Sequence, residues 1–372
     1  MCIGKKCIGC GIELQSEDTN KNGYLPEGKL QENGEHYCQR CFKIKNYGKY
    51  MPVRLNKDDY RKEVQEAMQY SKLAIAVFDI IDFEGSFDDE ILDVLREMDS
   101  IVVINKLDLI PDDKHPSEVS DWVKDRLAEE GIAPLDIAIV SSKNGYGING
   151  IFKKIKHFFP DGVEAIVLGT TNVGKSSIVN RLLGTKKVTV SKYPGTTLKS
   201  VKNQIPHTNI VLVDTPGLIP EGRISDLVCE ECNLKMVPSG EISRKTFKVK
   251  KGRALLIGEL LWFKVLNEDN TMPIFSLYAA KDVTFHETNT EKLKELLSSD
   301  RKDLFYPPCD NCRAQYKNLE MIKKKIKVQA GEELVFKGLG WISVKRGPLE
   351  IEVTLPKKAG ITVRNAFIKP KR

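Results

Sequence analysis

Mostly apolar runs of four to seven residues alternate with amphipathic stretches in the first part of the chain. The runs have the length and composition of strands that are buried on both faces. They span residues 73–79, 101–104, 135–140, 165–168 and 210–213. An entry helix is predicted from Asp58 to Lys72, and further helical stretches separate the runs. This alternation predicts an α/β fold with a doubly wound, mostly parallel sheet.

The pattern changes after about residue 246. Short alternating segments, such as 246–249 and 333–336, are separated there by Gly and Pro. Such segments are typical of short strands, and only the stretch from Thr290 to Ser298 has a helical pattern. We therefore predict a β-rich C-terminal domain that begins between residues 221 and 245.

A glycine-rich segment, Gly169 to Ser176, follows the apolar run at 165–168 and precedes a helical stretch that starts at Ser177. A phosphate loop needs backbone N–H groups around the β-phosphate, a lysine that reaches the β and γ oxygens, and a hydroxyl group for Mg²⁺. The helix N-terminus would face the phosphates. The phosphate-binding candidates are Gly169, Asn172, Val173, Gly174, Lys175, Ser176 and Ser177.

Two polar segments at the ends of other predicted strands indicate which base is bound. Asn105-Lys106-Leu107-Asp108 follows residues 101–104, and Ser141-Ser142-Lys143 follows residues 135–140. The Asp108 carboxylate can accept hydrogen bonds from guanine N1–H and from the exocyclic amine, while a backbone N–H of the second segment meets guanine O6. Adenine offers no such donor pair, and it would leave the carboxylate unpaired. The predicted ligand is therefore GTP or GDP.

A third segment, Asp214-Thr215-Pro216-Gly217, follows the run at 210–213. Asp214 can hold the outer shell of Mg²⁺, and the Gly217 N–H can sense the γ-phosphate. Pro194 to Thr197 forms a plausible switch loop that offers a second hydroxyl group to the metal. All of these segments lie at carboxyl ends of predicted strands, where an open α/β sheet binds its ligand.

The base motif precedes the phosphate motif, which reverses their order in ordinary GTPases. Such a permutation is physically allowed because domain termini usually lie close together, so old ends can be joined and new ends opened. Gly145 to Gly162 would be the joining segment. The switch region would then end the domain and run directly into the C-terminal part of the chain.

Eight of the nine cysteines form four C-x-x-C pairs, and Cys2 is left over. The first two pairs flank a short, turn-rich segment that cannot build a core, so a structural Zn²⁺ is favoured over free cysteines or redox dithiols. The last two pairs are far apart in sequence. A shared second Zn²⁺, separate turns without metal and an iron–sulfur cluster all stay open for them. The pairs are Cys7/Cys10, Cys38/Cys41, Cys229/Cys232 and Cys309/Cys312.

Positive charge gathers at the C-terminal end. Residues 321–372 hold 13 Lys and Arg against 4 Asp and Glu, whereas the whole chain has a net charge of only +7. The basic residues, interleaved with Trp341 and Phe367, suit a nucleic-acid backbone, although a solvated face that binds nothing is the alternative. No run approaches the roughly 18 apolar residues of a membrane span, and the N-terminus lacks a signal-peptide pattern. We expect a cytoplasmic protein without a membrane partner, and a monomer is favoured.

Taken together, these motifs resemble the YqeH group of circularly permuted bacterial GTPases. The likeness rests on the four-cysteine finger, the segment from Asp79 to Ser86, the reordered motifs, and the segment from Phe336 to Trp341. It implies a GTPase that acts in assembly of the small (30S) ribosomal subunit and contacts 16S rRNA. The group carries only the first four cysteines. The predicted domains are a zinc finger (1–50), a circularly permuted GTPase domain (51–222) and a basic β-rich domain (223–372).

The position of the usual catalytic glutamine is occupied by Leu218. Leucine cannot orient water, so intrinsic hydrolysis should be slow. In similar GTPases that lack the glutamine, the residue at the position of Asn172 helps to bind K⁺ beside the phosphates. Ser176 and Thr197 should bind Mg²⁺, and the expected catalytic group is Lys175, Asn172, Thr197, Asp214 and Gly217. The alternative function is an RNA-binding module with GTP as a regulatory ligand and little turnover.

Overall fold

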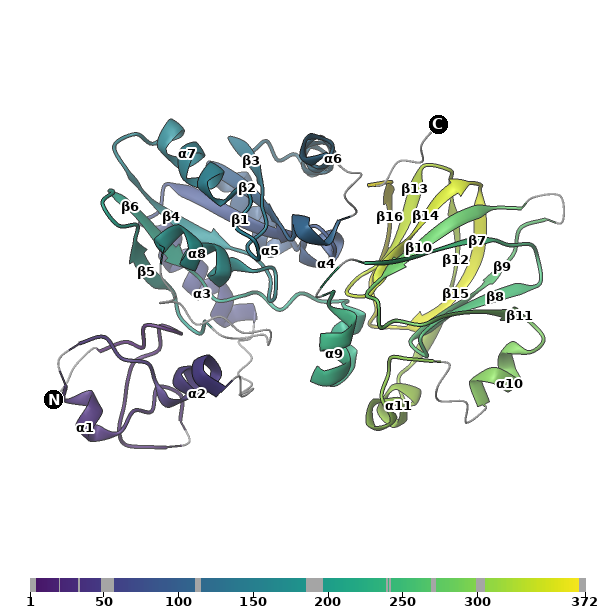
Figure 1. Cartoon of the computed structure of the whole chain (residues 1–372), viewed down its shortest axis with the longest axis horizontal. Coiled ribbons are helices and arrows are strands. Elements are labelled where there is room, and N and C mark those ends of the chain that lie inside the picture. Colours follow the sequence, from purple (N-terminus) through teal and green to yellow (C-terminus); the bar gives the residue numbers. More distant parts are fainter. Residues whose placement is uncertain are drawn as a thin grey trace. The chain divides into compact units, whose positions relative to one another are not determined.

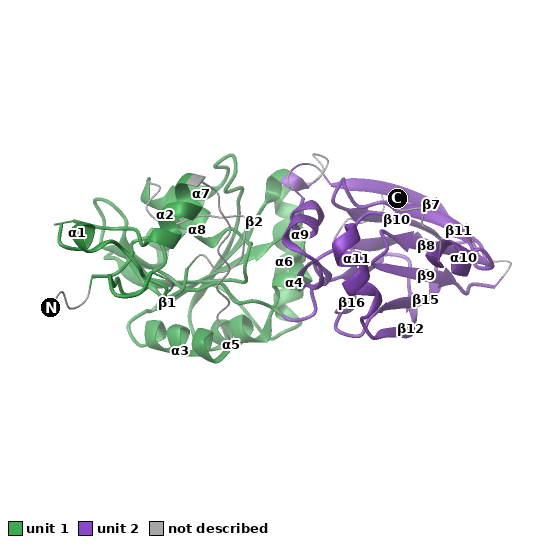
Figure 2. Cartoon of the chain, turned by 90° about the horizontal axis from the view of Figure 1, so that it is seen from below, with its two compact units in different colours: residues 1–108, 115–220 green, residues 109–114, 221–372 purple. Residues whose placement is uncertain are grey.

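The computed structural model describes residues 5–19, 21–32, 34–47, 57–110, 115–184, 197–238, 240, 242–268, 272–298 and 305–367. The chain forms two compact units, shown in different colours in Figure 2. Unit 1 comprises Met1–Asp108 and His115–Pro220, and unit 2 comprises Leu109–Lys114 and Glu221–Arg372. In the described parts, no helix has both the length and the apolarity to span a bilayer.

The first unit contains a six-stranded sheet in the order β3-β2-β1-β4-β6-β5. All neighbours are parallel except β5 and β6, so the predicted doubly wound, mostly parallel sheet is confirmed. The antiparallel edge strand β5 was not predicted. The strands are β1 (Leu73–Asp79), β2 (Ser100–Asn105), β3 (Asp136–Ile139), β4 (Val163–Leu168), β5 (Val201–Gln204) and β6 (Ile210–Asp214).

Six α-helices accompany this sheet (Figure 1). The predicted entry helix is α3, which ends at Met68 rather than at Lys72. The apolar residues of α7 recur at helical spacing, at Ile148, Ile151 and Ile155, and all three are buried in the same core as strands β1, β2 and β4. The helices are α3 (Lys57–Met68), α4 (Phe83–Ser86), α5 (Asp89–Glu97), α6 (Pro116–Ala128), α7 (Ile148–Phe158) and α8 (Lys175–Leu183), with a 3₁₀ turn η1 at Leu107–Leu109.

The sheet order explains how a permuted chain can build this domain. Strand β4, which leads into the phosphate loop, lies at the centre between β1 and β6. The predicted joining segment, Gly145 to Gly162, contains α7, which carries the chain from edge strand β3 to central strand β4. The base motif follows β2 and the phosphate loop follows β4, and only β1 separates these two strands in the sheet, although the sequence order of the motifs is reversed.

The N-terminal part of unit 1 is small and has little regular structure. It contains α1 (Glu27–Leu30) and α2 (Gln39–Tyr47), and its few buried apolar residues include Leu14 and Leu25. These residues surround four buried cysteines, which are described with the metal clusters below. Such a small apolar core is consistent with the expectation that a metal supplies stability here.

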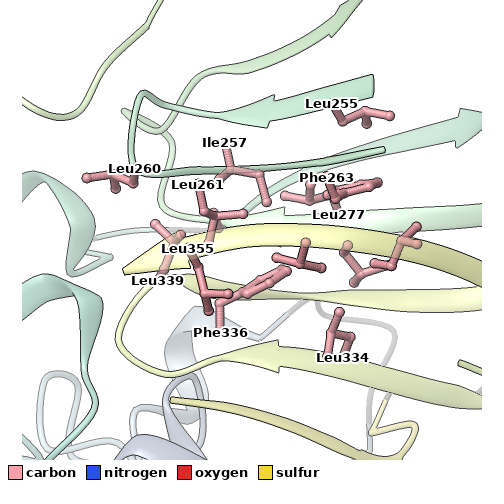
Figure 3. Close-up of a cluster of buried hydrophobic side chains, with 14 of the residues drawn as sticks. Leu255, Ile257, Leu260, Leu261, Phe263, Leu277, Leu334, Phe336, Leu339 and Leu355 are labelled. Carbon is pink, nitrogen blue, oxygen red and sulfur yellow. The ribbon is translucent and has the colours of Figure 1, made fainter. Parts of the chain in front are cut away.

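Unit 2 is built from two five-stranded antiparallel sheets, in the orders β16-β13-β14-β10-β7 and β11-β8-β9-β15-β12. Residues of both sheets share one apolar core, part of which Figure 3 shows. The predicted β-rich domain is thus confirmed as two sheets around one core. The strands are β7 (Ser243–Lys248), β8 (Arg253–Ile257), β9 (Leu261–Val265), β10 (Ile274–Ala279), β11 (Phe285–Asn289), β12 (Met321–Val328), β13 (Glu332–Phe336), β14 (Gly340–Arg346), β15 (Leu349–Pro356) and β16 (Ile361–Asn365).

The helices of unit 2 were only partly predicted. Helix α10 (Leu293–Ser298) lies within the expected helical stretch, but α9 (Glu230–Met236) and α11 (Asp310–Lys317) were missed, as was the 3₁₀ turn η2 (Ile224–Leu227). Helices of seven or eight residues are too short to show a clear apolar period. Each of the two missed α-helices begins directly after a cysteine, Cys229 or Cys309, which is its N-cap residue.

The basic C-terminal segments do not all contribute to the surface. Lysines 323, 324, 325 and 327 are exposed on edge strand β12, whereas Arg364 is buried and pairs with buried Glu333 at 3.0 Å. Trp341 and Phe367 are also buried, and Trp341 stacks on Tyr278 with ring centroids 5.0 Å apart. The expected interleaving of exposed aromatic and basic side chains is therefore wrong, because the aromatic rings fill the domain interior. The basic tail after Phe367 lies outside the described residues.

Candidate nucleotide site and metal clusters

Four neighbouring strands, β2, β1, β4 and β6, bring the predicted nucleotide motifs to one edge of the sheet. Asn105 and Asp214 are the last residues of β2 and β6, Asp79 is the last residue of β1, and Gly169 directly follows β4. Because these strands are parallel, their carboxyl ends lie on the same side. Motifs that are far apart and reversed in sequence are thereby brought together.

Asn105 connects three of the predicted segments, and its side chain is fully buried. Its Nδ2 donates to the Val173 carbonyl at 2.8 Å and to Ser142 Oγ at 3.1 Å, while its Oδ1 accepts from the Ser142 N–H at 2.8 Å. Gly174 is needed beside it, since a Cβ there would lie 2.3 Å from Asn105 Nδ2 and the backbone has a φ of +96°. Asn105 thus fixes the phosphate loop against the second base segment.

The carboxylate of Asp108 is held from two sides by the second base segment. Ser141 Oγ donates to Asp108 Oδ1 at 2.6 Å, and Lys143 Nζ lies 3.8 Å from Oδ2. Arg181 of α8 donates to the carbonyl oxygens of Ser142 and Lys143. Arg181 was not predicted, because a lone arginine in the last turn of a helix looks like an ordinary surface residue. Both base segments are therefore anchored by contacts within the protein.

The residues predicted for Mg²⁺ converge on Asp214. Ser176 Oγ and Thr197 Oγ1 lie 3.3 and 3.4 Å from Asp214 Oδ2, while Asp214 Oδ1 is buried without a hydrogen-bond partner in the described residues. Burial raises the pKa of Asp214, and the positive charge of Lys175 opposes that shift. Two hydroxyl groups and a buried carboxylate with an unused oxygen fit a hydrated Mg²⁺, which takes oxygen ligands and keeps several waters.

Lys175 is buried at the start of α8, and burial lowers its pKa while Asp214 opposes the shift. A Cβ at Gly217 would lie 3.4 Å from Lys175 Nζ, so the glycine lies beside the end of the lysine side chain. Asn172 adopts a left-handed backbone with a φ of +68°. Ser177 lies in the first turn of α8, beside the loop. Of the predicted switch loop, only Thr197 lies within the described residues.

Leu218 joins the phosphate loop through its backbone and is itself buried. Its N–H donates to the Gly169 carbonyl at 3.2 Å, and its carbonyl accepts from the Thr171 N–H at 2.7 Å. The buried leucine side chain itself carries no polar group. On the other side, Lys106 of the base motif pairs with Asp79, a contact that the motif alone did not predict.

The first two C-x-x-C pairs form a compact cluster, and all four of their cysteines are buried. The sulfur atoms of Cys7, Cys10, Cys38 and Cys41 lie within 4.8 Å of one another, and Cys10 Sγ is 3.9 Å from Cys38 Sγ. The Cys38 N–H also donates to Cys7 Sγ at 3.2 Å. Hydrogen bonds from the other three thiols hold the pKa of Cys7 far below its usual value. Four buried cysteine sulfurs in this arrangement fit a tetrahedral Zn²⁺.

The second four cysteines are also brought together, although the two pairs are far apart in sequence. The sulfur atoms of Cys229, Cys232, Cys309 and Cys312 lie within 4.8 Å of one another. The pairs are arranged symmetrically: the Cys229 N–H donates to Cys312 Sγ at 2.9 Å, and the Cys309 N–H donates to Cys232 Sγ at 3.1 Å. Separate turns without mutual contact are therefore excluded. This cluster also fits a metal ion.

Comparison with known proteins adds independent findings. A family model described as "50S ribosome-binding GTPase" matches residues 164–250, and one described as "YqeH-like, C-terminal" matches residues 272–367. YqeH of Bacillus subtilis, which is described as uncharacterized, is 29% identical over 367 residues, covering 97% of this chain and 99% of its own. NO-associated protein 1 of Arabidopsis thaliana is 24% identical over 390 residues, covering 91% and 69% of the two chains.

GTPase Der of Caldanaerobacter subterraneus is 32% identical over 178 residues, which cover 45% of this chain and 38% of its own. That match is limited to part of the chain, whereas the similarity to YqeH extends along nearly all of it. The reversed motif order, the two matched domains and this end-to-end similarity identify the chain as a circularly permuted GTPase of the YqeH type.

Proposed function

We propose that this GTPase acts in the assembly of the small ribosomal subunit in the cytoplasm, where its nucleotide state controls binding to 16S rRNA. The observation that carries the GTP-dependent part is the convergence of Asn105, Asp108, Lys175 and Asp214 at one sheet edge. The ribosomal part is supported by the matched ribosome-binding GTPase model and by the resemblance to YqeH. In this proposal, GTP favours docking and hydrolysis favours release.

The geometry supports the following residue roles as part of this proposal. Asp108 would select guanine, Lys175 would bind the β and γ phosphates, and Ser176 and Thr197 would bind Mg²⁺ with Asp214 behind them. When bound, Mg²⁺ neutralises phosphate charge. The finger (1–50) would bind zinc, the GTPase domain (51–222) would bind the nucleotide, and the basic domain (223–372) would contact RNA.

The exposed lysines of β12 are the proposed RNA contact. Lys323, Lys325 and Lys327 project from the same face of an edge strand, since side chains alternate along a strand. Lys327 is paired with Glu350 at 2.7 Å, so not all of this charge is available. Lysines also protect sheet edges from pairing with other chains. If these lysines contact RNA, the affinity of the protein for RNA should fall as the salt concentration rises. Protection of the sheet edge alone would not produce such a salt dependence.

A second candidate is an RNA-binding module in which GTP is a regulatory ligand and turnover is incidental. The burial of Leu218 favours it, because the apolar side chain at the usual glutamine position cannot orient a hydrolytic water. The two candidates differ in one measurable respect. An assembly GTPase should be stimulated by ribosomal particles, whereas a regulatory site should not.

Association with ribosomal particles is expected to depend on nucleotide state. Cell extract would be sedimented with GTP, a non-hydrolysable analogue or GDP, and the gradient fractions would be probed for the full chain. We expect co-sedimentation with the small subunit in the analogue and release in GDP. Lys323→Glu with Lys325→Glu should weaken association in every nucleotide state. Lys62→Glu with Lys124→Glu, which reverses two exposed lysines of the first unit, serves as the charge-matched control. Association with the large subunit, or association that ignores nucleotide, would refute the proposal.

We also propose that K⁺ assists hydrolysis beside Asn172. This chain lacks the glutamine, and a cation near the phosphates would offset the charge that develops in the transition state. Replacing K⁺ by Na⁺ is expected to lower kcat by about 10-fold, a modest share of what electrostatic stabilisation can supply. In Asn172→Ser the two salts should give equal rates. Steady-state phosphate release in the two chlorides tests this, and equal rates in the unmodified chain would contradict it.

A further inference from the structure

We propose that the first four-cysteine cluster, loaded with metal, positions Thr197 for Mg²⁺ and thereby favours GTP over GDP. This inference rests on the proposed function of the nucleotide site. It assigns the finger a role in nucleotide selection in addition to its structural role. The coupling runs through residues 197–200, which connect Thr197, the proposed Mg²⁺ ligand, to edge strand β5.

The finger holds this segment by its backbone. The carbonyl of Cys10 accepts hydrogen bonds from the Leu198 N–H at 2.9 Å and from the Lys199 N–H at 3.0 Å. Leu198 is 4% exposed and packs in the same apolar cluster as Cys7, Cys10, Cys38 and Cys41. The side chain of Leu198, which directly follows Thr197, is therefore part of the apolar core of the finger rather than of the GTPase domain.

The backbone of the finger at Gly11 lies so close to the backbone of Lys199 that no side chain fits between the two segments. A Cβ at Gly11 would lie 2.5 Å from the Lys199 carbonyl oxygen, and Gly11 has a φ of +73°. Cys10 also supplies one of the four sulfur atoms of the cluster. A bound metal would therefore fix the residue whose carbonyl accepts the hydrogen bonds from the Leu198 and Lys199 N–H groups. Cys10 therefore links the metal position to Leu198 and Lys199, and Leu198 directly follows Thr197.

Helix α3 holds the same segment from a second direction. Glu63 accepts from the Ser200 N–H at 2.9 Å through Oε2, and its Oε1 lies 3.2 Å from Lys199 Nζ. Thr197 itself is buried and lies 3.4 Å from Asp214. The finger and α3 together fix residues 198–200, which directly follow Thr197, and the Thr197 hydroxyl lies toward Asp214 at the proposed metal position.

The thermodynamic consequence has a definite sign. Thr197 contacts the ligand only when Mg²⁺ and the γ-phosphate are both bound, as in GTP-dependent switches. If residues 197–199 were not already ordered, GTP binding would have to supply the free energy of ordering them, whereas GDP binding would not. Loss of the finger contact should therefore weaken GTP binding selectively. By reciprocity, bound GTP should stabilise the finger by the same factor.

The test uses Leu198→Ala in the full chain, with Leu198→Met as the conservative variant. Affinities for a non-hydrolysable GTP analogue with Mg²⁺ and for GDP would be measured by fluorescence titration, and bound zinc would be counted in each protein. In Leu198→Ala we expect the analogue to bind about 10-fold more weakly, within the usual range of coupling between two sites. Affinity for GDP and the zinc content should stay unchanged, and Leu198→Met should restore the analogue affinity.

Equal weakening of both nucleotides, or no weakening, would overturn the proposal. A second measurement avoids dependence on the fold of the variant: amide hydrogen exchange of the unmodified chain with the analogue or with GDP. Exchange at residues 7–11 should be slower with the analogue, and equal exchange would contradict the coupling. If the unmodified chain bound no guanine nucleotide at all, the proposed function itself would fail, and this outcome is distinguishable from the others.

Discussion

Asp108→Asn is expected to shift nucleotide preference from guanine to xanthine. Guanine presents two donors, N1–H and the exocyclic amine, and both are matched by the two carboxylate oxygens of Asp108. Asparagine replaces one acceptor by an NH₂ donor, which would face the guanine amine but would match the carbonyl oxygen of xanthine. GTP affinity should fall by about 10³-fold or more, because a site built for a hydrogen bond strongly rejects the unmatched ligand.

The local structure favours survival of the fold in this variant. Ser141 Oγ donates to Asp108 Oδ1 at 2.6 Å, and the asparagine carbonyl oxygen can keep that hydrogen bond. The control is Asp136→Asn, which removes a carboxylate that pairs with Lys154 and not with the base segments. Titration with fluorescent GDP and XDP measures the shift. Unchanged guanine preference in Asp108→Asn would disprove our assignment of the base site.

The second cysteine cluster is expected to hold one Zn²⁺, so the full chain should contain two. Zn–S bonds of about 2.3 Å in a tetrahedron place the sulfur atoms roughly 3.8 Å apart. Cys229 Sγ and Cys309 Sγ are 3.7 Å apart, and all four sulfurs lie within 4.8 Å. Several irons with bridging sulfides between the cysteines would need a wider set. The geometry therefore favours a single ion over an iron–sulfur cluster.

Cys309→Ser with Cys312→Ser should therefore lose one of the two zinc ions. Loss of a structural site can remove several kcal/mol of folding free energy, because the metal closes a long loop between the two cysteine pairs. We expect a large fall in the thermal midpoint of unit 2. Cys38→Ser with Cys41→Ser is the matched control, since it removes the other ion from unit 1. Metal analysis decides: two zinc ions in the variant, or iron in the unmodified chain, would contradict the assignment.

The convergence of the predicted nucleotide motifs at one sheet edge was largely predictable, because each motif is local and follows a buried strand. Glycines, a lysine and an aspartate at strand ends carry their chemistry within a few residues, and buried parallel strands are easy to recognise. The contacts between segments were not predictable. Arg181 holds the base segment and Leu198 enters the finger core only because of tertiary packing.

The basic C-terminal domain shows the opposite case. Its β-rich character followed from the short alternating segments, but the exposure of single residues did not. Trp341 and Arg364 were expected on the surface and lie inside, where Trp341 stacks on Tyr278 and Arg364 pairs with buried Glu333. A count of charges along the sequence does not say which side chains face the core. In this domain the buried share differs between strands: most of β15 is buried, whereas most of β12 is not.

The hydrogen bonds of Asn105 have an evolutionary consequence. They join residues 68 and 37 positions away, and they act between side chain and loop whatever route the backbone takes from one to the other. A gene rearrangement that cuts the chain elsewhere therefore leaves these bonds intact. The contacts that hold the site together therefore do not depend on the order in which the chain supplies its segments.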